Sequence, residues 1–300
     1  PVFSVQLTNG SSQLLVTPVL DGSSKVFRCD TSPNGSRPRA LFNWYKRSEN
    51  QSPILIQDQS VSTPSPTPDV NLSMVISYST LALMGNRSYQ NMYIYCEARD
   101  ETNRGNFLKS TEAQINIVYG PTISLIDYTE VEEGENVSIA CKVTANPQPD
   151  IVWSRNGTVI SPSSDTLRIP NILRLNDGNY TCTASNVLYP TWQAPIYQIA
   201  TDTIMIRVLY GPGSSIYLTP NYSLYHVDEG NKAVDIICSA TCNPVCSYRW
   251  IKGNAQLSSS NTLSLGIIQK NKTGNYICEA FNTIRGQMKG SNRSLEVIVR

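Results

Sequence analysis

Apolar and polar residues alternate along much of the chain, and a period of two is the pattern of β-strands. The alternation is clearest at residues 137–141 and 234–238, and clusters of Gly, Pro, Asn and Ser separate such runs. No window shows a sustained helical period. Many short strands with turns between them predict an all-β fold, either a sandwich or a barrel.

The chain contains three copies of one unit. Residues 141–153 align without a gap on residues 238–250, each segment running from a cysteine to a tryptophan. A looser first copy has Cys29, Trp44 and Cys96. The motif Tyr-Gly-Pro recurs at residues 119–121 and 210–212. Since 300 residues fit two or three domains of about 100 to 200 residues, we predict domains at residues 1–119, 120–210 and 211–300.

Cysteines and glycosylation motifs indicate the compartment. Eight cysteines accompany eleven Asn-x-Ser/Thr acceptor motifs, and together they favour an oxidising, secretory route over a cytosolic protein rich in Asn and Ser. We therefore predict an extracellular glycoprotein, on the cell surface or secreted. The acceptor residues are Asn9, Asn34, Asn50, Asn71, Asn86, Asn136, Asn156, Asn179, Asn221, Asn271 and Asn292.

The order cysteine, tryptophan, cysteine in each copy resembles the immunoglobulin superfamily over nearly the whole chain. A tyrosine stands two residues before the last cysteine at Tyr180 and Tyr276, as in that fold, whereas the first copy has Ile94 there. The resemblance implies three tandem immunoglobulin-like β-sandwiches, the first V/I-like, the second I/C2-like and the third C2-like. It implies structural disulfides Cys29–Cys96, Cys141–Cys182 and Cys238–Cys278, covered by Trp44, Trp153 and Trp250.

One further cysteine pair, Cys242 and Cys246, lies between the first bridge cysteine and the tryptophan of copy three. A disulfide would fix the shape of this loop, which should face the junction with copy two. Free or intermolecular thiols are one alternative. Zinc is another, but it needs four ligands and His226, the one histidine, lies outside the cluster.

Charge and chemistry exclude several classes of function. The formal net charge is +1, which argues against nucleic acid as the main partner. No apolar run approaches the roughly 18 to 20 residues of a membrane span, so we expect no membrane insertion within this piece. We expect a processed, soluble piece whose anchor or tail lies outside it. With one histidine and no nucleophile motif, we predict no enzyme, no cofactor and no metal site.

An acidic turn before the third strand of copy two is the one place where a cation is an alternative. It contains Glu130, Glu132, Glu133 and Glu135. The pattern of a 12-residue calcium loop is absent. We therefore interpret this segment as a solvated acidic turn, with a calcium site as the second interpretation.

A binding face is predicted on copy one. If Trp44 points into the core, Tyr45 and Arg47 point outward; if Cys96 points inward, Tyr93, Tyr95 and Arg99 point outward. The two strands share one sheet in the immunoglobulin fold, so these side chains should form a single face. Tyrosine and arginine are enriched at interfaces, and no acceptor motif lies on either strand. The alternative is that the tyrosines serve strand packing alone.

Two weaker contact regions follow. The segment before the last strand of copy two should expose Leu188, Tyr189, Trp192 and Ile196, an apolar patch that contacts copy one or a ligand. The loop of residues 30–39 carries Arg37 and Arg39, which could meet an acidic ligand or simply keep the loop solvated.

Finer resemblances point to a function. Copy three, with Tyr248-Arg-Trp250, looks like C2-type domains of the carcinoembryonic-antigen and sialic-acid-binding-lectin group. Copy one, with Cys96-Glu-Ala98, looks like domains of nephrin-like adhesion proteins. These families imply adhesion or immune recognition through the C–F–G face of the outermost domain. We predict binding of a protein partner, homophilic or heterophilic; the alternative is an immune-type or lectin-like module whose Arg99 pairs with an acidic sugar of a glycan or foreign ligand.

Overall fold

The computed structural model describes residues 6–8, 16–32, 35–36, 39–57, 61–62, 67–68, 75–100, 107–191 and 193–300. The chain forms two compact units. Unit 1 comprises Pro1–Ile123, Lys142–Ile151 and Thr183–Thr201; unit 2 comprises Ser124–Cys141, Val152–Cys182 and Asp202–Arg300. Both units take part of the second repeat, so the three domain boundaries stay a prediction.

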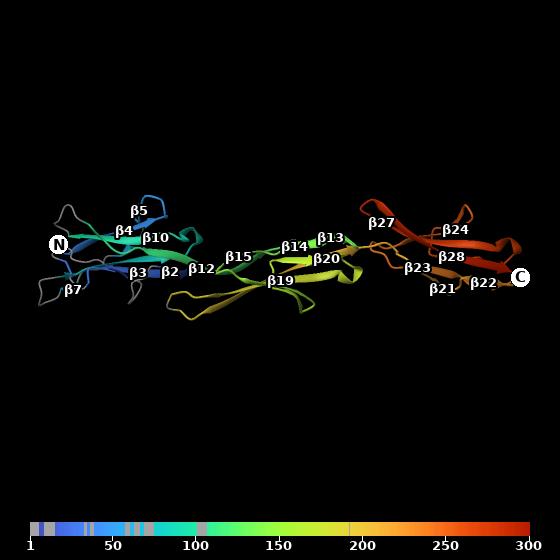
Figure 1. Ribbon diagram of the computed structural model, residues 1–300, viewed down its shortest axis with the longest axis horizontal. Coiled ribbons are helices and arrows are strands. Elements are labelled where there is room, and N and C mark those ends of the chain that lie inside the picture. The colour runs from blue at the N-terminus through green and yellow to red at the C-terminus, as the bar shows by residue number, and fades with distance from the viewer. Residues whose placement is uncertain are drawn as a thin grey trace. The chain divides into compact units, whose positions relative to one another are not determined.

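Strands dominate the described residues, and the all-β prediction is confirmed. The helical elements among them are three single 3-10 turns, η1 (Arg87–Tyr89), η2 (Arg174–Asn176) and η3 (Lys270–Lys272). No helix in the described ranges has the length and apolar character needed to cross a bilayer. Figure 1 labels the strands along the chain.

The first repeat is a sandwich of two sheets. The smaller sheet has the order β1-β3-β9-β6, and the larger has the order β15-β12-β10-β4-β5, with β2 parallel to β12 and β11 beside β10. In this larger sheet β15 comes from the second repeat and pairs with β12. A two-stranded ribbon, β7-β8, is separate. The strands are β1 (Gln6–Thr8), β2 (Val16–Leu20), β3 (Ser24–Asp30), β4 (Ala40–Arg47), β5 (Ile54–Leu55), β6 (Val61–Ser62), β7 (Thr67–Pro68), β8 (Val75–Ile76), β9 (Tyr78–Met84), β10 (Tyr93–Asp100), β11 (Leu108–Lys109), β12 (Ala113–Ser124) and β15 (Lys142–Asn146).

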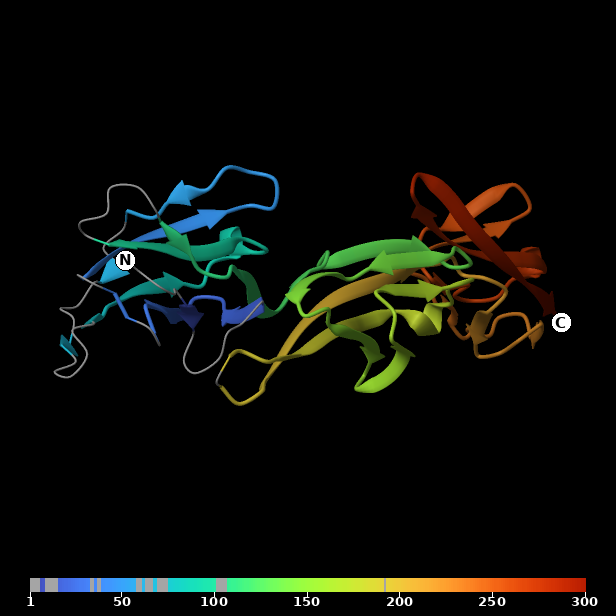
Figure 2. The ribbon, with the colours of Figure 1, turned by 60° about the vertical axis from the view of Figure 1, so that its left-hand side comes forward.

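The second and third repeats use the same plan. Their larger sheets have the orders β13-β20-β19-β16-β17 and β22-β28-β27-β24-β25; their smaller sheets are β14-β18 and β21-β23-β26. The second repeat contains β13 (Tyr128–Glu132), β14 (Val137–Ala140), β16 (Asp150–Arg155), β17 (Thr158–Pro162), β18 (Thr166–Ile169), β19 (Gly178–Leu188) and β20 (Ile196–Leu209). The third contains β21 (Ile216–Thr219), β22 (Leu224–Val227), β23 (Ile236–Ala240), β24 (Ser247–Lys252), β25 (Ala255–Ser258), β26 (Thr262–Leu263), β27 (Gly274–Ile284) and β28 (Gln287–Val299). Figure 2 shows the long β27-β28 hairpin of the third repeat in red.

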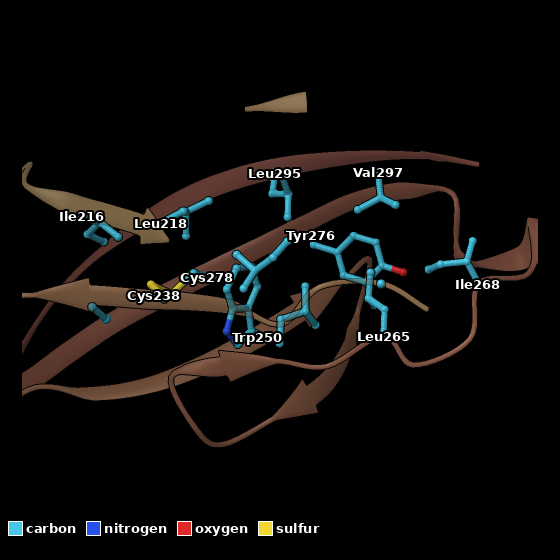
Figure 3. Packing of buried hydrophobic residues seen from close by; sticks show 14 residues of the cluster. Ile216, Leu218, Cys238, Trp250, Leu265, Ile268, Tyr276, Cys278, Leu295 and Val297 are labelled. Carbon is cyan, nitrogen blue, oxygen red and sulfur yellow. A yellow bond between two sulfur atoms is a disulfide. The ribbon is translucent and has the colours of Figure 1, made fainter. Parts of the chain in front are cut away.

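Each sandwich encloses one disulfide and one tryptophan. The disulfides join the same cysteines that the resemblance pairs, with Cα–Cα distances of 6.4, 6.4 and 6.5 Å. Trp44, Trp153 and Trp250 are each at most 1% exposed. In Figure 3, Trp250 lies beside the Cys238–Cys278 bridge, among Leu218, Leu265 and Leu295. In the chain-entropy model, loops of this length stabilise each repeat by about 4 kcal/mol.

The tyrosine corner is present in the two repeats whose sequence contains it. Tyr180 Oη donates to the Asn176 carbonyl at 2.9 Å, and Tyr276 Oη donates to the Lys272 carbonyl at 2.8 Å. Each tyrosine is 1% exposed, so this bond satisfies a hydroxyl that burial removes from water. Ile94 fills the position in the first repeat and is buried without needing a partner.

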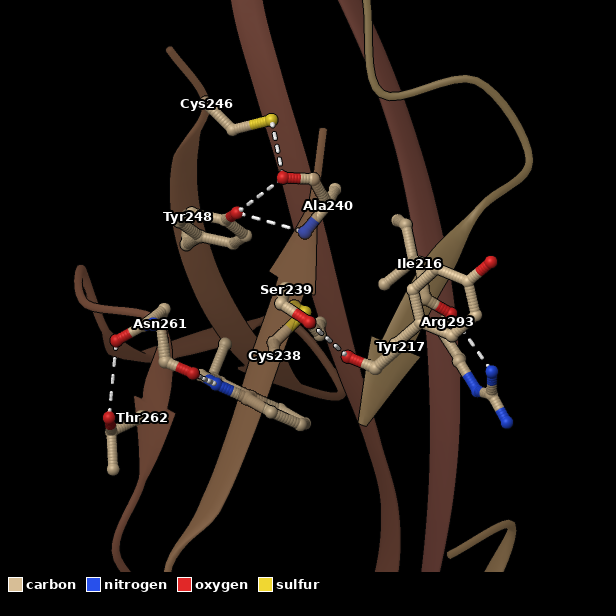
Figure 4. Close-up of a disulfide and its surroundings, with 12 residues drawn as sticks. Ile216, Tyr217, Cys238, Ser239, Ala240, Cys246, Tyr248, Asn261, Thr262 and Arg293 are labelled. Atoms are coloured by element: carbon tan, nitrogen blue, oxygen red, sulfur yellow. Dashed lines mark hydrogen bonds between the residues drawn. A yellow bond between two sulfur atoms is a disulfide. The ribbon is translucent and has the colours of Figure 1, made fainter. Parts of the chain in front are cut away.

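The extra cysteine pair of the third repeat also forms a disulfide. Cys242 and Cys246 have a Cα–Cα distance of 5.3 Å, and the bridge spans the segment that contains Asn243. Asn243 N donates to Tyr210 O at 2.9 Å, and Tyr210 N donates to Asn243 O at 2.8 Å. The loop therefore contacts the segment that joins repeats two and three, as we expect from the sequence. Figure 4 shows Tyr248 donating to the Ala240 carbonyl beside this loop.

Candidate functional site

The predicted binding face lies on the outer side of β4 and β10. The two strands pair antiparallel, with Trp44 opposite Cys96 and Tyr45 opposite Tyr95. Since Trp44 and Cys96 point into the core, alternate residues point to the other side of the sheet. We call the outward side chains of these two strands the tyrosine face; they are Asn43, Tyr45, Arg47, Tyr93, Tyr95, Glu97 and Arg99.

Tyr95 points to the outer side of the sheet, as we expect from alternation, but it is buried there. Its ring stacks on Tyr45, with ring centroids 5.2 Å apart, and Lys109 Nζ lies 3.9 Å from its centroid on strand β11. These neighbours leave Tyr95 3% exposed, and desolvation raises the pKa of its hydroxyl. Tyr95 therefore packs beside Tyr45 within the face, and the half-buried Tyr45 is the ring that a partner can reach.

No strand signal in the sequence marks β11, so the burial of Tyr95 could not be predicted. Lys109 lies opposite Glu97 on β11, and its side chain reaches over the ring of Tyr95. Buried Ser110 holds the turn after it: Cys96 N donates to Ser110 Oγ at 3.1 Å, and Ser110 N donates to Cys96 O at 2.9 Å. Lys109 and Glu112, three residues apart, form an ion pair at 2.7 Å across this turn.

Arg47 is held in place by charge and by an aromatic ring. Its Nε donates to Glu112 Oε1 at 3.0 Å, Nη2 donates to Oε2, and the guanidinium lies 4.6 Å from the centroid of Tyr93. Bonds from Arg47, and then from Lys109, hold the pKa of Glu112 down at about 2. The bond to Glu112 raises the pKa of Arg47. A bidentate pair of this kind orders the side chain before any partner arrives.

The edges of the tyrosine face carry exposed apolar side chains. Leu55, opposite Tyr45 on β5, is 38% exposed, and Phe107 is 41% exposed. Arg99 stacks on Phe107 at 5.0 Å and has no ion pair with any described carboxylate. The face thus combines a stacked aromatic pair, an ordered arginine and an apolar rim, the composition that hot spots share.

Acceptor asparagines lie elsewhere on the surface. Neither β4 nor β10 contains a glycosylation motif, whereas Asn179 lies on β19 and Asn292 lies on β28, on the corresponding sheets of repeats two and three. Asn9, Asn34 and Asn71 lie outside the described residues. The described acceptors are all exposed; they are Asn50, Asn86, Asn136, Asn156, Asn179, Asn221, Asn271 and Asn292.

The predicted apolar patch of repeat two is only partly present. Leu188 is 1% exposed and belongs to the core, because it continues the inward side of β19. Tyr189 is 63% exposed, Ile196 is half-buried and Trp192 lies outside the described residues. Within unit 1, Thr191 Oγ1 donates to Pro18 O at 3.0 Å. Thr191 N donates to the same oxygen at 3.2 Å, so two hydrogen bonds connect this segment to the first repeat.

The repeated Tyr-Gly-Pro motif contacts a pair of equivalent asparagines, each four residues after the last bridge cysteine in a repeated Cys-x-Ala-x-Asn pattern that could have indicated them. Each side-chain amide bridges the tyrosine carbonyl and a proline carbonyl. Asn186 Nδ2 donates to Tyr119 O at 3.1 Å and to Pro147 O at 2.9 Å, and Asn282 Nδ2 donates to Tyr210 O at 3.0 Å and to Pro244 O at 2.8 Å.

The glycine of each motif is required by close packing. A Cβ on Gly120 would lie 2.8 Å from Gln198 Cβ, and one on Gly211 would lie 2.7 Å from Lys289 Cβ. Real Cβ atoms do not approach so closely, so neither position accepts a larger residue without a shift of backbone. Both segments that join consecutive repeats are therefore built alike.

The acidic turn of repeat two is partly exposed to solvent, in agreement with its interpretation as a solvated turn, and three of its carboxylates also form ion pairs. Glu132 pairs with Lys289 at 2.6 Å, Glu133 with Arg174 at 2.6 Å and Glu135 with Arg285 at 2.7 Å. The hydrogen bonds from Arg174 and Arg285 lower the pKa of Glu133 and Glu135 respectively. Within the described ranges, no group of three His, Cys, Asp or Glu side chains is arranged to hold a metal ion.

The loop of residues 30–39 is described only in part. Arg37 lies outside the described residues, and Arg39 is exposed. Asp30 pairs with Arg28 at 3.1 Å. No ligand site follows from these contacts.

Comparison with known families agrees with the sandwich geometry. Residues 121–186 match the family model of the immunoglobulin domain. Residues 121–186 therefore lie in an immunoglobulin domain, and the three sandwiches share the immunoglobulin fold. Two solved structures share the fold over almost the whole chain: a chain from Dpr2 Ig1-Ig2 in complex with DIP-Theta Ig1-Ig3 (TM-score 0.57, 16% identity, 98% of this chain and 100% of that chain) and the titin I-band fragment I67-I69 (TM-score 0.55, 16% identity, 95% and 96%).

Sequence relatives of these immunoglobulin domains are larger proteins. The mouse peroxidasin homolog is 32% identical over 53% of this chain and 11% of its own length. Human cell adhesion molecule 4 is 26% identical over 50% of this chain and 38% of its own length, and human myelin-associated glycoprotein is 27% identical over 61% and 29%. The chain thus spans less than two fifths of each of these relatives.

Proposed function

We propose that the chain is part of an extracellular adhesion or recognition protein, and that it binds a protein partner through the tyrosine face of its first repeat. The observation that carries the proposal is the Tyr45–Tyr95 stack beside the Arg47–Glu112 pair, on strands without an acceptor motif. Relatives that include cell adhesion molecule 4 and myelin-associated glycoprotein support this class of function. Nothing in the proposal requires catalysis.

The side chains of the tyrosine face are ordered before a partner binds, and this is the physical reason to favour this face. Binding is weakened when rotamer-rich side chains must be immobilised, at about 0.5–1.5 kcal/mol each. Arg47 and Tyr45 are already held by Glu112 and Tyr95, so they lose little freedom on contact. The apolar rim of Leu55 and Phe107 supplies area that a partner can remove from water.

The proposal is tested with a variant that changes the rim and spares the core. Leu55→Asp together with Phe107→Asp places charges on exposed positions, and we expect it to weaken partner binding by about 100-fold. Met288→Asp, at a 68% exposed residue of the third repeat, is the matched control and should leave binding unchanged. Partner binding is measured with the tetramerised chain as a probe of a library of cell-surface proteins. Self-association of the chain is measured by sedimentation. Equal binding by a folded double variant would refute the face assignment.

A second candidate is recognition of an acidic sugar by Arg99. Its guanidinium is ordered on Phe107, and an arginine held in this way can form charge-assisted bonds to an anionic ligand. A glycan array probed with the parent chain and with Arg99→Gln separates the two classes. Loss of a specific acidic-glycan signal in the variant supports the sugar ligand, and absence of any such signal leaves protein binding as the proposal.

A further inference from the structure

A cleft opens on one edge of the third repeat. It has a volume of about 580 Å³ and is lined by β25 and β26, the edge strands of the two sheets. Its floor consists of core residues, namely Leu263, Leu265 and Tyr276, which are 2%, 7% and 1% exposed. The rim carries the hydroxyls of Ser258, Ser260, Thr262 and Ser264.

This lining matches the chemistry of a sugar ring. A pyranose presents C–H groups on its faces and hydroxyls at its edge, so it packs on aliphatic or aromatic surface while its edge bonds to polar groups. The cleft offers an apolar floor and the 47% exposed Leu257 as a side wall, with hydroxyls around them. Its described lining contains no carboxylate, and its cations are Lys252 and Lys272.

A glycosylation acceptor lies on the rim of the same cleft. Asn271 is exposed and begins the motif Asn271-Lys272-Thr273 within η3. Its backbone is held there, because Lys252 Nζ donates to Asn271 O at 2.9 Å and lies 4.9 Å from the centroid of Tyr276. The attachment point of a glycan is therefore fixed at the edge of the cleft.

Comparison with the second repeat shows which features of the cleft are specific to the third repeat. An equivalent cleft of about 380 Å³ lies between β17 and β18. Arg155 Nη2 donates to Leu175 O at 2.6 Å, just as Lys252 bonds to Asn271 O, so Leu175 and Asn271 occupy the same place. Leu175 is 79% exposed and cannot be glycosylated. Of the two clefts, the larger and more hydroxyl-rich one has the acceptor on its rim.

We propose that the core N-acetylglucosamine residues of an N-linked glycan on Asn271 lie in this cleft and cover the open edge of the third repeat. A short tether gives an effective concentration on the order of millimolar, so even a weak contact between sugar and cleft is populated. The glycan shields the free edges of β25 and β26, which would otherwise present unpaired backbone groups to other chains. The glycan is then part of the packed structure of the third repeat.

The test compares two acceptor sites on secreted protein from glycosylating cells. We expect the amides of β25 and β26 to exchange hydrogen at least ~5-fold faster in Asn271→Gln than in the parent. Asn292→Gln, which removes an acceptor outside the cleft lining, is the control and should leave those amides unchanged. Leu257→Ala keeps the acceptor but removes a cleft wall, and it should give part of the same acceleration.

Enzymatic trimming makes the test independent of whether a variant folds. Trimming folded parent protein to a single N-acetylglucosamine should keep the slow exchange, and complete deglycosylation should abolish it. Equal exchange before and after complete deglycosylation would overturn the proposal. So would glycopeptide mass spectrometry that finds Asn271 without a glycan.

Discussion

The first and third repeats present the same face of the same sandwich with different side chains. At the positions of Tyr45 and Tyr95, each beside a core tryptophan or cysteine, the third repeat has Ile251 and Ile277. Where Asn43 faces Glu97 in the first repeat, Arg249 pairs with Glu279 in the third. Asn292, a glycosylation acceptor, lies directly opposite Glu279.

The comparison shows which side chains the fold requires and which it does not. Both faces rest on a cystine and a buried tryptophan, so the fold does not require the tyrosines or the Arg47–Glu112 pair. An aromatic, pre-ordered face without acceptors suits contact with another protein, whereas a glycan on β28 would keep the third repeat apart from neighbours. Repeat three is therefore the natural control for any experiment on repeat one.

The largest expected effect comes from adding a glycan to the tyrosine face of the first repeat. Tyr45→Thr creates an Asn-x-Thr acceptor motif that begins at Asn43, on the outer side of β4. We expect an occupied site to weaken partner binding at least ~100-fold, because the sugar covers the centre of the interface. Binding affinity and glycopeptide mass spectrometry are the measurements.

The matched control is Tyr45→Val, because valine has the shape of threonine but creates no motif. This variant loses the stacked ring alone, and we expect about a 10-fold loss of affinity. If the glycosylated threonine variant binds as well as the valine variant, the partner does not cover this face.

The second comparison concerns stability. Tyr95→Ala removes a buried ring, and we expect the free energy of unfolding of the first repeat to fall by about 3–4 kcal/mol. Ile277→Ala, at the equivalent but half-buried position, should cost the third repeat about 1–2 kcal/mol. Calorimetry with repeat-resolved hydrogen exchange measures both. Similar small losses would mean that Tyr95 does not support the face.

The smallest expected effect is electrostatic. Glu112→Gln should destabilise the first repeat by less than about 1 kcal/mol, since water screens part of the pair, and Glu279→Gln should cost still less because Arg249 is 43% exposed. The folded-state pKa of Glu112, at about 2, lies below its ordinary value of 4.5. Its contribution is therefore complete above about pH 4.5 and is lost as the pH falls towards 2.

Unfolding measured between pH 6 and pH 2 checks the sign. The difference between the parent chain and Glu112→Gln should shrink as the pH falls. A difference that grows at low pH would contradict the ion pair.

Much of the fold follows from residues that must be buried together. The spacing of Cys141, Trp153 and Cys182 indicates the sandwich, and Tyr180 and Tyr276 indicate the corner, because each of these side chains has one role in this architecture. The outward direction of Tyr45 and Arg47 follows from strand alternation. Alternation also gives the outward direction of Tyr95 but not its burial, since alternation carries no information on what covers a sheet.

The rest depends on contacts between residues far apart in the chain. The amide of Asn186 reaches a carbonyl 67 positions earlier in the sequence, and Arg285 reaches a carboxylate 150 positions earlier. No local pattern marks either contact. The same holds for Leu188, whose burial depends on where β19 ends within the core.

The most direct test of the central claim is the footprint of the bound partner, or of self-association, on the chain. Hydrogen exchange of the complex should protect β4, β5, β10 and β11 and leave β24, β27 and β28 as they are in the free chain. Protection of the third repeat, with the first repeat unchanged, would contradict the assignment of recognition to the tyrosine face.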